Sequence, residues 1–198
     1  MLVLIMAGGE GSRLNLGEKS MVTFAGKPML SYVIDAFKEA EFNVVVALTN
    51  RNPIAMNWCR INGIDYVKTQ GKGYIADLIE AVLEIEEKRP LFTSISDIPC
   101  VTSSIIQRIW SYYQNSKKEA CSTWVPLQLT QNLGISVRYI EFVEGEKVDP
   151  VGVNILNGKN IERPQEEYKL VLNEPELAFH VNTRQDLEIV RQHFHIKF

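Results

Sequence analysis

The start of the chain is the feature that most restricts its fold. Residues 2–6 (LVLIM) form an unbroken apolar run, and residues 7–11 (AGGEG) follow it directly. Such a run is typical of a strand that is buried on both faces, as in a largely parallel sheet. We therefore expect an α/β protein whose first strand ends in a glycine-rich turn.

The turn has the composition of a phosphate-binding loop. Glycine permits positive φ and lets successive N–H groups converge on an anion. Ser12 can donate a hydroxyl hydrogen bond, Arg13 offers a bidentate fork for phosphate oxygens, and Lys19 adds a mobile positive charge. Together they predict a polyphosphate cradle. An ordinary strand-to-helix turn is the alternative, but it does not explain two cations just after the glycines.

Two better-known nucleotide motifs are excluded. A Walker A loop requires Gly-Lys-Ser/Thr after four intervening residues, and that sequence is absent here. The dinucleotide fingerprint requires a third glycine, but Leu14 stands at that position. The predicted phosphate loop is therefore of another kind.

The bulk composition is that of an ordinary globular protein. With 198 residues, 45% of them apolar and 23% charged, the chain suits a single domain over residues 1–198. The net charge of −3 and the pI near 5.7 argue against a nucleic-acid partner. We expect neither a membrane span nor a targeting segment, because the first apolar run is too short. Three widely spaced cysteines indicate a reduced, cytoplasmic location.

Strands and helices are expected to alternate over most of the chain. Apolar runs predict strands at residues 2–6, 43–48, 64–68 and 91–95, with helices between them. Asn52 with Pro53 is typical of an N-cap followed by proline in the first turn, and Thr102 is the expected N-cap of another helix. Helical crossovers of this kind make the strands parallel.

The alternation weakens past Cys121. We expect strands at residues 122–127, 134–142, 168–172 and 178–181, and a turn at 131–132. Gly152 lies inside an apolar run, which indicates a bulge or the close approach of a ligand. Thr183 and Asp186 form a capping-box pattern that predicts a final helix.

Candidate site residues follow several of the expected strands. Ligands of open α/β sheets bind outside the carboxyl ends of the strands, so the first turn, residues 69–73 and Asp97 should meet there. Asp97 can hold a divalent metal that bridges phosphates, or it can cap a surface loop. Lys72 contacts a nucleotide or is solvated, and Asn182 completes the metal site or is a turn residue. His180, His193 and His195 do not form a metal set and are expected to be structural or solvated.

Several of these stretches resemble the signature of the nucleotidyltransferases that join an NTP to a phosphorylated acceptor. The matching residues are 4–13, 18–19, 96–99 and 181–187. This superfamily includes the sugar-phosphate enzymes and the molybdenum-cofactor guanylyltransferases. The resemblance implies a three-layer, Rossmann-like α/β fold with a mixed, mostly parallel sheet, of the nucleotide-diphospho-sugar transferase type.

Within the superfamily, residues 70–78 and 150–154 look most like the archaeal adenosylcobinamide-phosphate guanylyltransferases. That resemblance implies transfer of GMP from GTP to adenosylcobinamide phosphate, with release of pyrophosphate and with Mg²⁺ as cofactor. The partners would be these two small molecules. The strand-rich region 120–156 is a candidate homodimer interface.

The resemblance also implies the role of each site residue. The catalytic residues would be Arg13, Lys19 and Asp97. The nucleotide contacts would be Ala7, Gly8, Gly9, Gly11, Ser12, Arg13, Thr69, Gly71, Lys72, Gly73 and Asp97. Gly152 and Asn154 would bind the acceptor, and Asp97 and Asn182 the metal.

The sequence departs from the family pattern at two positions. Many relatives hold magnesium with two carboxylates, whereas Asn182 stands at the second position here, and Ser20 stands where proline is frequent. Two alternatives remain open. One is a different acceptor, as in the molybdenum-cofactor or sugar-phosphate enzymes, and the other is a regulatory protein that binds nucleotide without turnover.

Overall fold

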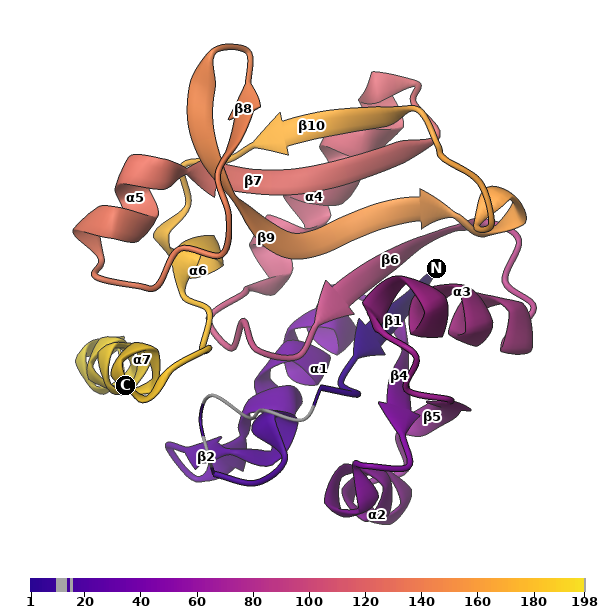
Figure 1. Ribbon diagram of the computed structural model, residues 1–198, viewed down its shortest axis with the longest axis horizontal. Coiled ribbons are helices and arrows are strands. Elements are labelled where there is room, and N and C mark those ends of the chain that lie inside the picture. The colour runs from indigo at the N-terminus through magenta and orange to yellow at the C-terminus, as the bar shows by residue number, and fades with distance from the viewer. Residues whose placement is uncertain (10–13, 15, 198) are drawn as a thin grey trace.

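One mixed sheet runs through the computed structural model, which describes residues 1–9, 14 and 16–197 (Figure 1). Among these residues, the strand order is β10-β7-β9-β6-β1-β4-β5, and β8 pairs with β9 beside this path. The strands are β1 (Leu2–Met6), β4 (Asn43–Thr49), β5 (Asp65–Thr69), β6 (Pro90–Ile95), β7 (Ala120–Pro126), β8 (Glu141–Val143), β9 (Glu146–Asn157) and β10 (Glu167–Val171). A short hairpin, β2 (Thr23–Phe24) and β3 (Lys27–Pro28), stands apart.

The sheet is mostly parallel. β1 pairs in parallel with β4 and β6, β4 with β5, and β7 with β10. β9 is antiparallel to β6, β7 and β8. The predicted mixed, mostly parallel α/β fold is therefore confirmed.

Helices cover both faces of the sheet. They are α1 (Met29–Glu39), α2 (Pro53–Ile61), α3 (Tyr74–Glu84), α4 (Ser103–Ser116), α5 (Leu127–Asn132), α6 (Pro175–Ala178) and α7 (Arg184–Lys197). Alternate residues of β1 face opposite layers: Ile5 packs in one core with Phe37 of α1 and Ile106 of α4, whereas Leu4 packs in another with Leu78 of α3. In Figure 1, α4 lies behind the sheet and α3 lies in front of it. This arrangement gives the three expected layers.

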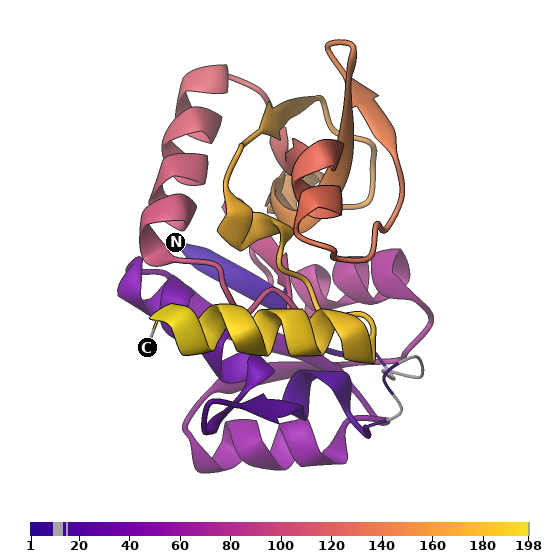
Figure 2. The ribbon, with the colours of Figure 1, turned by 90° about the vertical axis from the view of Figure 1, so that its left-hand side faces the viewer.

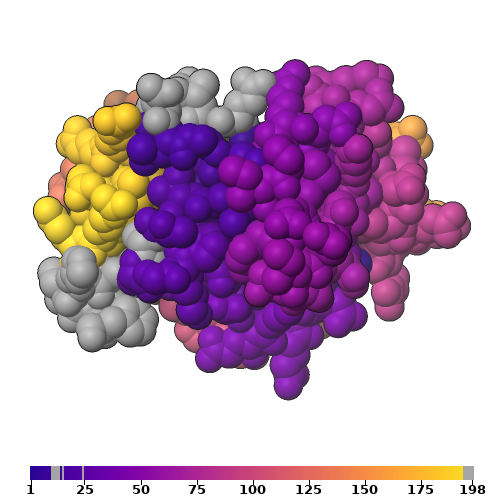
Figure 3. Space-filling view, turned by 90° about the horizontal axis from the view of Figure 1, so that it is seen from below, coloured from indigo at the N-terminus to yellow at the C-terminus, as the bar shows by residue number. Residues whose placement is uncertain are grey.

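The last helix lies beside the beginning of the chain. Figure 2 shows α7 crossing the front of the molecule, and Figure 3 shows it next to the N-terminal segments on the lower face. Leu187 and Val190 of α7 share a small core with Leu14, Val22 and Met29. Residues from the beginning and from the end of the sequence therefore pack together in one core.

Three local expectations were wrong: the turn at 131–132, which is the end of α5, and the strands at 134–142 and 178–181. Residues 127–132 form α5 and residues 135–140 have no regular structure, so the strand expected at 134–142 is reduced to β8. β-branched residues in this segment suggested a strand, but it lacks ladder partners until Glu141. The strand expected at 178–181 is also wrong, because Pro175 starts the short helix α6.

Helix caps were predicted with mixed success. Thr102 caps α4 through Ile105 N, and Thr183 with Asp186 forms the capping box of α7, with reciprocal bonds of 3.1 and 2.8 Å. Asn52 stands at the N-cap position of α2, but its side chain makes no cap bond. Among the described residues, no helix is long and apolar enough to cross a membrane.

Candidate active site

The carboxyl ends of β1, β4, β5 and β6 border a cavity of about 330 Å³, which we call the strand-end cavity. Its lining consists of Met6, Ala7, Gly8, Gly9, Lys19, Ser20, Arg51, Gly71, Gly73, Tyr74, Asp77, Ile95, Ser96 and Asp97. The first glycine turn, the loop after β5 and Asp97 therefore meet, as the parallel strands predicted. Arg51 and Asp77 were not among the expected site residues.

The first turn fits closely against the end of β4. A Cβ at Gly8 would lie only 2.8 Å from Thr49 Cγ2, so a side chain there would push β1 and β4 apart. A Cβ at Gly9 would meet nothing within 4 Å, so the space beside Gly9 is open. Gly11, Ser12 and Arg13 lie outside the described residues.

The loop after β5 is held by carboxylates of α3. Asp77 Oδ1 accepts from Gly71 N at 2.9 Å and from Lys72 N at 3.1 Å, and Glu80 accepts from Gln70 N at 3.1 Å. Gly71 and Gly73 line the strand-end cavity, as predicted for nucleotide contacts. Thr69 and Lys72 do not line it. Thr69 is buried, and its hydroxyl donates to the carbonyl oxygen of Leu48 at 3.3 Å.

A charged cluster closes one side of the cavity. The Lys19 ammonium donates to the Asp97 carboxylate and, at 2.7 Å, to Asn182 Oδ1. Arg138 approaches the other carboxylate oxygen of Asp97 at 3.5 Å. Burial opposes ionisation of Asp97, but the charges of Arg138 and Lys19 outweigh it and hold the pKa of Asp97 below its usual value. Asp97 is therefore a stable anion between two cations.

Arg138 is a further site residue that the sequence did not indicate. It lies in the irregular segment before β8, and its other guanidinium nitrogen donates to the carbonyl oxygen of Val151 at 3.3 Å. A Cβ at Gly152, where φ is +83°, would lie 2.4 Å from Ile95 and 2.9 Å from Arg138. The close approach that Gly152 indicated is thus made by these two side chains.

A single buried carboxylate organises the segments that supply Asn182 and Arg138. Asp186, which is 1% exposed, accepts from the backbone N–H groups of Asn182 and Thr183 at 3.0 and 2.8 Å. It also accepts from Ser136 N at 2.9 Å and from the Ser136 hydroxyl at 2.8 Å. Burial disfavours its charge, but these hydrogen bonds outweigh burial and lower the pKa of Asp186.

A second cavity, of about 340 Å³, lies on the face of β6, β9 and β7 that α4 does not cover (Figure 1). We call it the open-face groove. Gly152 and Asn154 both line it, as do Tyr74, Trp124, Tyr139 and Lys169. Trp124 and Tyr139 meet edge to face at 5.9 Å, and the Lys169 ammonium lies 5.7 Å from the Trp124 ring centroid. Because Tyr74 lines both cavities, the two adjoin.

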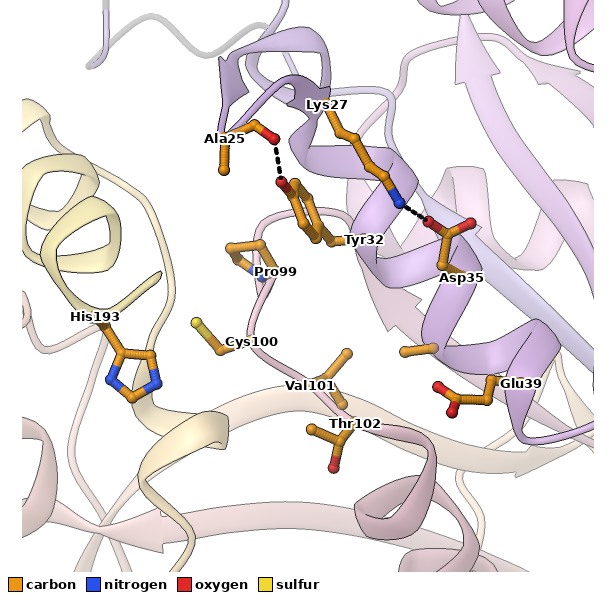
Figure 4. Close-up of a pocket in the computed structure, with 11 residues that line it drawn as sticks. Ala25, Lys27, Tyr32, Asp35, Glu39, Pro99, Cys100, Val101, Thr102 and His193 are labelled. Atoms are coloured by element: carbon orange, nitrogen blue, oxygen red, sulfur yellow. Dashed lines mark hydrogen bonds and ion pairs between the residues drawn. The ribbon is translucent and has the colours of Figure 1, made fainter. Parts of the chain in front are cut away.

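A larger cavity, of about 500 Å³, lies between α1, the loop after β6 and α7 (Figure 4). Lys27 and Asp35 form an ion pair of 2.9 Å at its edge, and Tyr32 donates to the carbonyl oxygen of Ala25 at 3.2 Å. His193 faces it from α7 (Figure 4). None of the predicted site residues that the structure describes lines this cavity.

Metal-ligating groups are sparse. Among the described residues, no three His, Cys, Asp or Glu side chains cluster in a way that could hold a metal ion. Asp97 and Asn182 supply two oxygens, and both accept hydrogen bonds from Lys19. His180 is buried, with Nε2 2.6 Å from the carbonyl oxygen of Ser136, and burial with the nearby charge of Arg138 lowers its pKa to about 4.

The glycine turn, Lys19, Asp97 and Asn182 meet beside the carboxyl ends of β1 and β6. A family model, the MobA-like NTP transferase domain, matches residues 3–149, and the chain belongs to that family. It is therefore a nucleotidyltransferase.

Relatives agree with this assignment. The chain is 29% identical to the adenosylcobinamide-phosphate guanylyltransferase of Methanocaldococcus jannaschii, over 96% of this chain and 95% of that protein. It is 29% identical to the molybdenum cofactor guanylyltransferase of Yersinia pestis over 61% of this chain, and spans 59% of that protein.

The fold is shared more widely. The structure of CMP:2-keto-3-deoxy-manno-octonic acid synthetase complexed with CTP superimposes with a TM-score of 0.73 at 14% identity. That match covers 100% of this chain and 99% of the other chain.

Proposed function

We propose that this protein transfers GMP from GTP to adenosylcobinamide phosphate, giving adenosylcobinamide-GDP and pyrophosphate. The observation that carries the proposal is the match to the Methanocaldococcus enzyme, which includes 96% of this chain and so both adjoining cavities. The molybdenum-cofactor enzyme matches 61% of the chain and supports the alternative acceptor less well.

The strand-end cavity is proposed to bind GTP. Its glycine turn and Lys19 would receive the triphosphate, and Gly11, Ser12 and Arg13 are proposed to complete the phosphate contacts. Asp77 supports the site indirectly, because it accepts from the N–H groups of Gly71 and Lys72 and so fixes the loop after β5. The fixed loop at Gly71 and Gly73 would lie against the nucleoside.

The transfer step needs positioning and charge neutralisation more than covalent chemistry. An oxygen of the acceptor phosphate attacks the α-phosphorus of GTP in line, the bond to the bridging oxygen of the β-phosphate breaks, and pyrophosphate leaves. Lys19 would neutralise the charge on the α-phosphate. Arg138 lies between Asp97 of the strand-end cavity and Gly152 of the open-face groove, which suits it to contact the acceptor phosphate.

Mg²⁺ is proposed as the cofactor, held by Asp97 and Asn182. One carboxylate and one amide oxygen are donor types that Mg²⁺ accepts beside phosphate oxygens and water. Both oxygens accept hydrogen bonds from Lys19 in the structure, so the pair fits the ion only when Lys19 is released from them. When bound, the ion supplies positive charge to the triphosphate.

The open-face groove is proposed to hold the acceptor. Its aromatic wall, formed by Tyr74, Trp124 and Tyr139, suits a large apolar body such as a corrinoid ring. Gly152 and Asn154 would lie beneath that body. The groove opens onto a sheet face, so an acceptor wider than a sugar can extend beyond it.

The wider setting is also a proposal. We propose that residues 1–198 act as one domain, which the continuous sheet supports. We also propose that the protein works in the cytoplasm, which is supported by three buried cysteines that form no disulfide among the described residues. Exposed Ile140 and Phe142 support the proposed homodimer through the region around β8. Sedimentation of the wild type and of Phe142→Ser tests the dimer.

The function is tested by incubating the protein with GTP and one acceptor at a time and following pyrophosphate. We expect release with adenosylcobinamide phosphate. Pyrophosphate release with molybdopterin or with a sugar phosphate, but not with adenosylcobinamide phosphate, would contradict the proposed acceptor. Tight GTP binding without release for any acceptor would favour the regulatory alternative. Calorimetry against the four NTPs tests the base, and a preference for CTP or UTP would contradict guanylyl transfer.

A further inference from the structure

Glu18, the residue before Lys19, contacts a helix that lies far along the chain. Its two carboxylate oxygens accept hydrogen bonds from consecutive backbone N–H groups at the start of α2, from Ile54 at 2.7 Å and from Ala55 at 2.8 Å. The side chain therefore ties the segment that carries Lys19 to the N-terminus of α2.

The start of α2 requires such an acceptor from outside the helix. Asn52 is at the N-cap position, but its Oδ1 accepts from the backbone N–H of Thr49 at 3.1 Å and from the Thr49 hydroxyl at 2.8 Å. Pro53 has no N–H to donate. The next two N–H groups are those that Glu18 accepts, and the positive end of the helix dipole favours a carboxylate there. Glu18 thus replaces the missing side-chain cap.

The contact matters for Lys19 because it anchors the side of the turn that precedes Lys19, whereas Met21 and Val22 on the other side pack against hydrophobic cores. Lys19 begins a single 3-10 turn, η1 (Lys19–Met21), in which Met21 N donates to the carbonyl oxygen of Glu18 at 2.9 Å and Val22 N to that of Lys19 at 3.2 Å. In the structure the Lys19 ammonium reaches Asp97 and Asn182 at the edge of the strand-end cavity. A long lysine side chain reaches a defined point only when its backbone is fixed.

The helix terminus that Glu18 holds closely follows a residue that lines the strand-end cavity. Arg51 lines that cavity immediately before α2, so Glu18 fixes the Lys19 turn relative to the space proposed for GTP. We infer that Glu18 is a positioning residue that holds Lys19 in place for nucleotidyl transfer. This inference rests on the proposed function, and Glu18 itself touches no reacting atom.

A double-mutant cycle tests the inference, with pyrophosphate release as the readout. Glu18→Ala is expected to lower kcat about 10- to 100-fold, with the Kd for GTP nearly unchanged, because a small displacement of a reacting group costs rate rather than ground-state binding. In the Lys19→Ala background, Glu18→Ala is expected to cause no further loss. Losses that multiply would overturn the inference, since Glu18 would then act independently of Lys19.

Matched variants separate positioning from helix stability. Glu18→Asp keeps the carboxylate and should recover part of kcat, whereas Glu18→Gln should recover less. Arg60→Ala removes another contact of α2, the 2.8 Å bond to Asn57, and should leave kcat at the wild-type value. Thermal unfolding of every variant shows that it is folded at the assay temperature. If Glu18→Ala is unfolded there, Glu18→Gln takes its place in the cycle.

A readout without turnover keeps the inference separate from the proposed function. In protein labelled at the lysine nitrogens, the NMR signal of the Lys19 ammonium should shift in Glu18→Ala and remain in place in Arg60→Ala. An unmoved signal would overturn the inference. Absence of wild-type pyrophosphate release with adenosylcobinamide phosphate would overturn the proposed function alone.

Discussion

The two cavities of the site are built in different ways. The strand-end cavity is formed by short loops that directly follow β1, β4, β5 and β6, so its residues lie next to the apolar runs that predict those strands. The open-face groove is formed by side chains on the faces of β9 and β7, together with Tyr139 from an irregular segment. The first depends on local sequence, and the second depends on how distant strands pair.

The difference extends to chemistry. Glycines and charged side chains make up much of the strand-end cavity, whereas the open-face groove combines three aromatic rings with aliphatic, polar and charged side chains. Asp97 and Arg138 join the two, because Arg138 arrives from the groove side and pairs with the carboxylate at the end of β6. A variant at either cavity should therefore affect one substrate, and a variant at the junction should affect the transfer between them.

The largest effect is expected at Lys19. Lys19→Ala should lower kcat about 10³-fold, as for loss of a group that stabilises transition-state charge, and should change the Kd for GTP much less. Pyrophosphate release and calorimetry measure the two quantities. Lys27→Ala, which removes an exposed lysine paired with Asp35, is the control and should retain wild-type kcat. A loss below about threefold in Lys19→Ala would remove Lys19 from the mechanism.

The pH dependence of stability tests the burial of His180 beneath the Arg138 segment. Its folded pKa is about 4 and its ordinary value is 6.5, so between these values the unfolded chain binds a proton that the folded protein does not. Stability should therefore fall as the pH drops from 6.5 to 4, by up to about 3 kcal/mol.

Denaturant unfolding at several pH values measures this slope, and His180→Gln should flatten it within the same window. An unchanged slope would show that other groups are responsible. Asp97 and Asp186 act in a separate, more acidic window, because their lowered pKa values mean that their contribution is lost only as the pH falls below the ordinary carboxylate range.

The junction is tested by Arg138→Ala. We expect kcat/KM for the corrinoid acceptor to fall about 100-fold, with the Kd for GTP little changed, because the acceptor phosphate loses a charged partner and its alignment. Arg138→Lys keeps the charge without the fork and should recover only part of the activity. An equal loss of affinity for GTP and for the acceptor would show that Arg138 acts in the strand-end cavity instead.

The smallest effect is expected on the wall of the open-face groove. Tyr139→Ala should raise KM for the corrinoid about fivefold and leave the Kd for GTP unchanged, as for loss of one partly exposed aromatic contact. Tyr112→Ala, at an exposed tyrosine of α4 outside the groove lining, is the matched control. A change in GTP binding without a change in KM for the corrinoid would contradict the division between the two cavities.

The sequence predicted which strand ends meet at the strand-end cavity because the signals for those strands are local. Lys19 and Asp97 each follow a recognisable apolar run, and Asn182 precedes a capping box, so their meeting required only a parallel sheet and a final helix. The residues that hold them were harder to find. Glu18 acts by capping a helix more than thirty residues away, which no spacing rule expresses.

The open-face groove was predicted less well because its structure is set by long-range pairing. Residues 135–140 contain β-branched side chains, yet they have no ladder partner, and Arg138 is fixed instead by Asp149, Val151 and the space left by Gly152. The glycine itself was visible in the sequence. The side chains that fill the space above Gly152 are those of Ile95 and Arg138. They can be identified only when β9 is placed between β6 and β7.

The position of β9 also bears on how the chain is made. A ribosome releases β6 and β7 before β9, so the two earlier strands must remain unpaired with each other until the later one arrives to join them. Asn182 emerges later still, ahead of α7. A nascent chain that already contains the glycine turn therefore still lacks Asn182. We expect nucleotidyl transfer only after α7 has been synthesised.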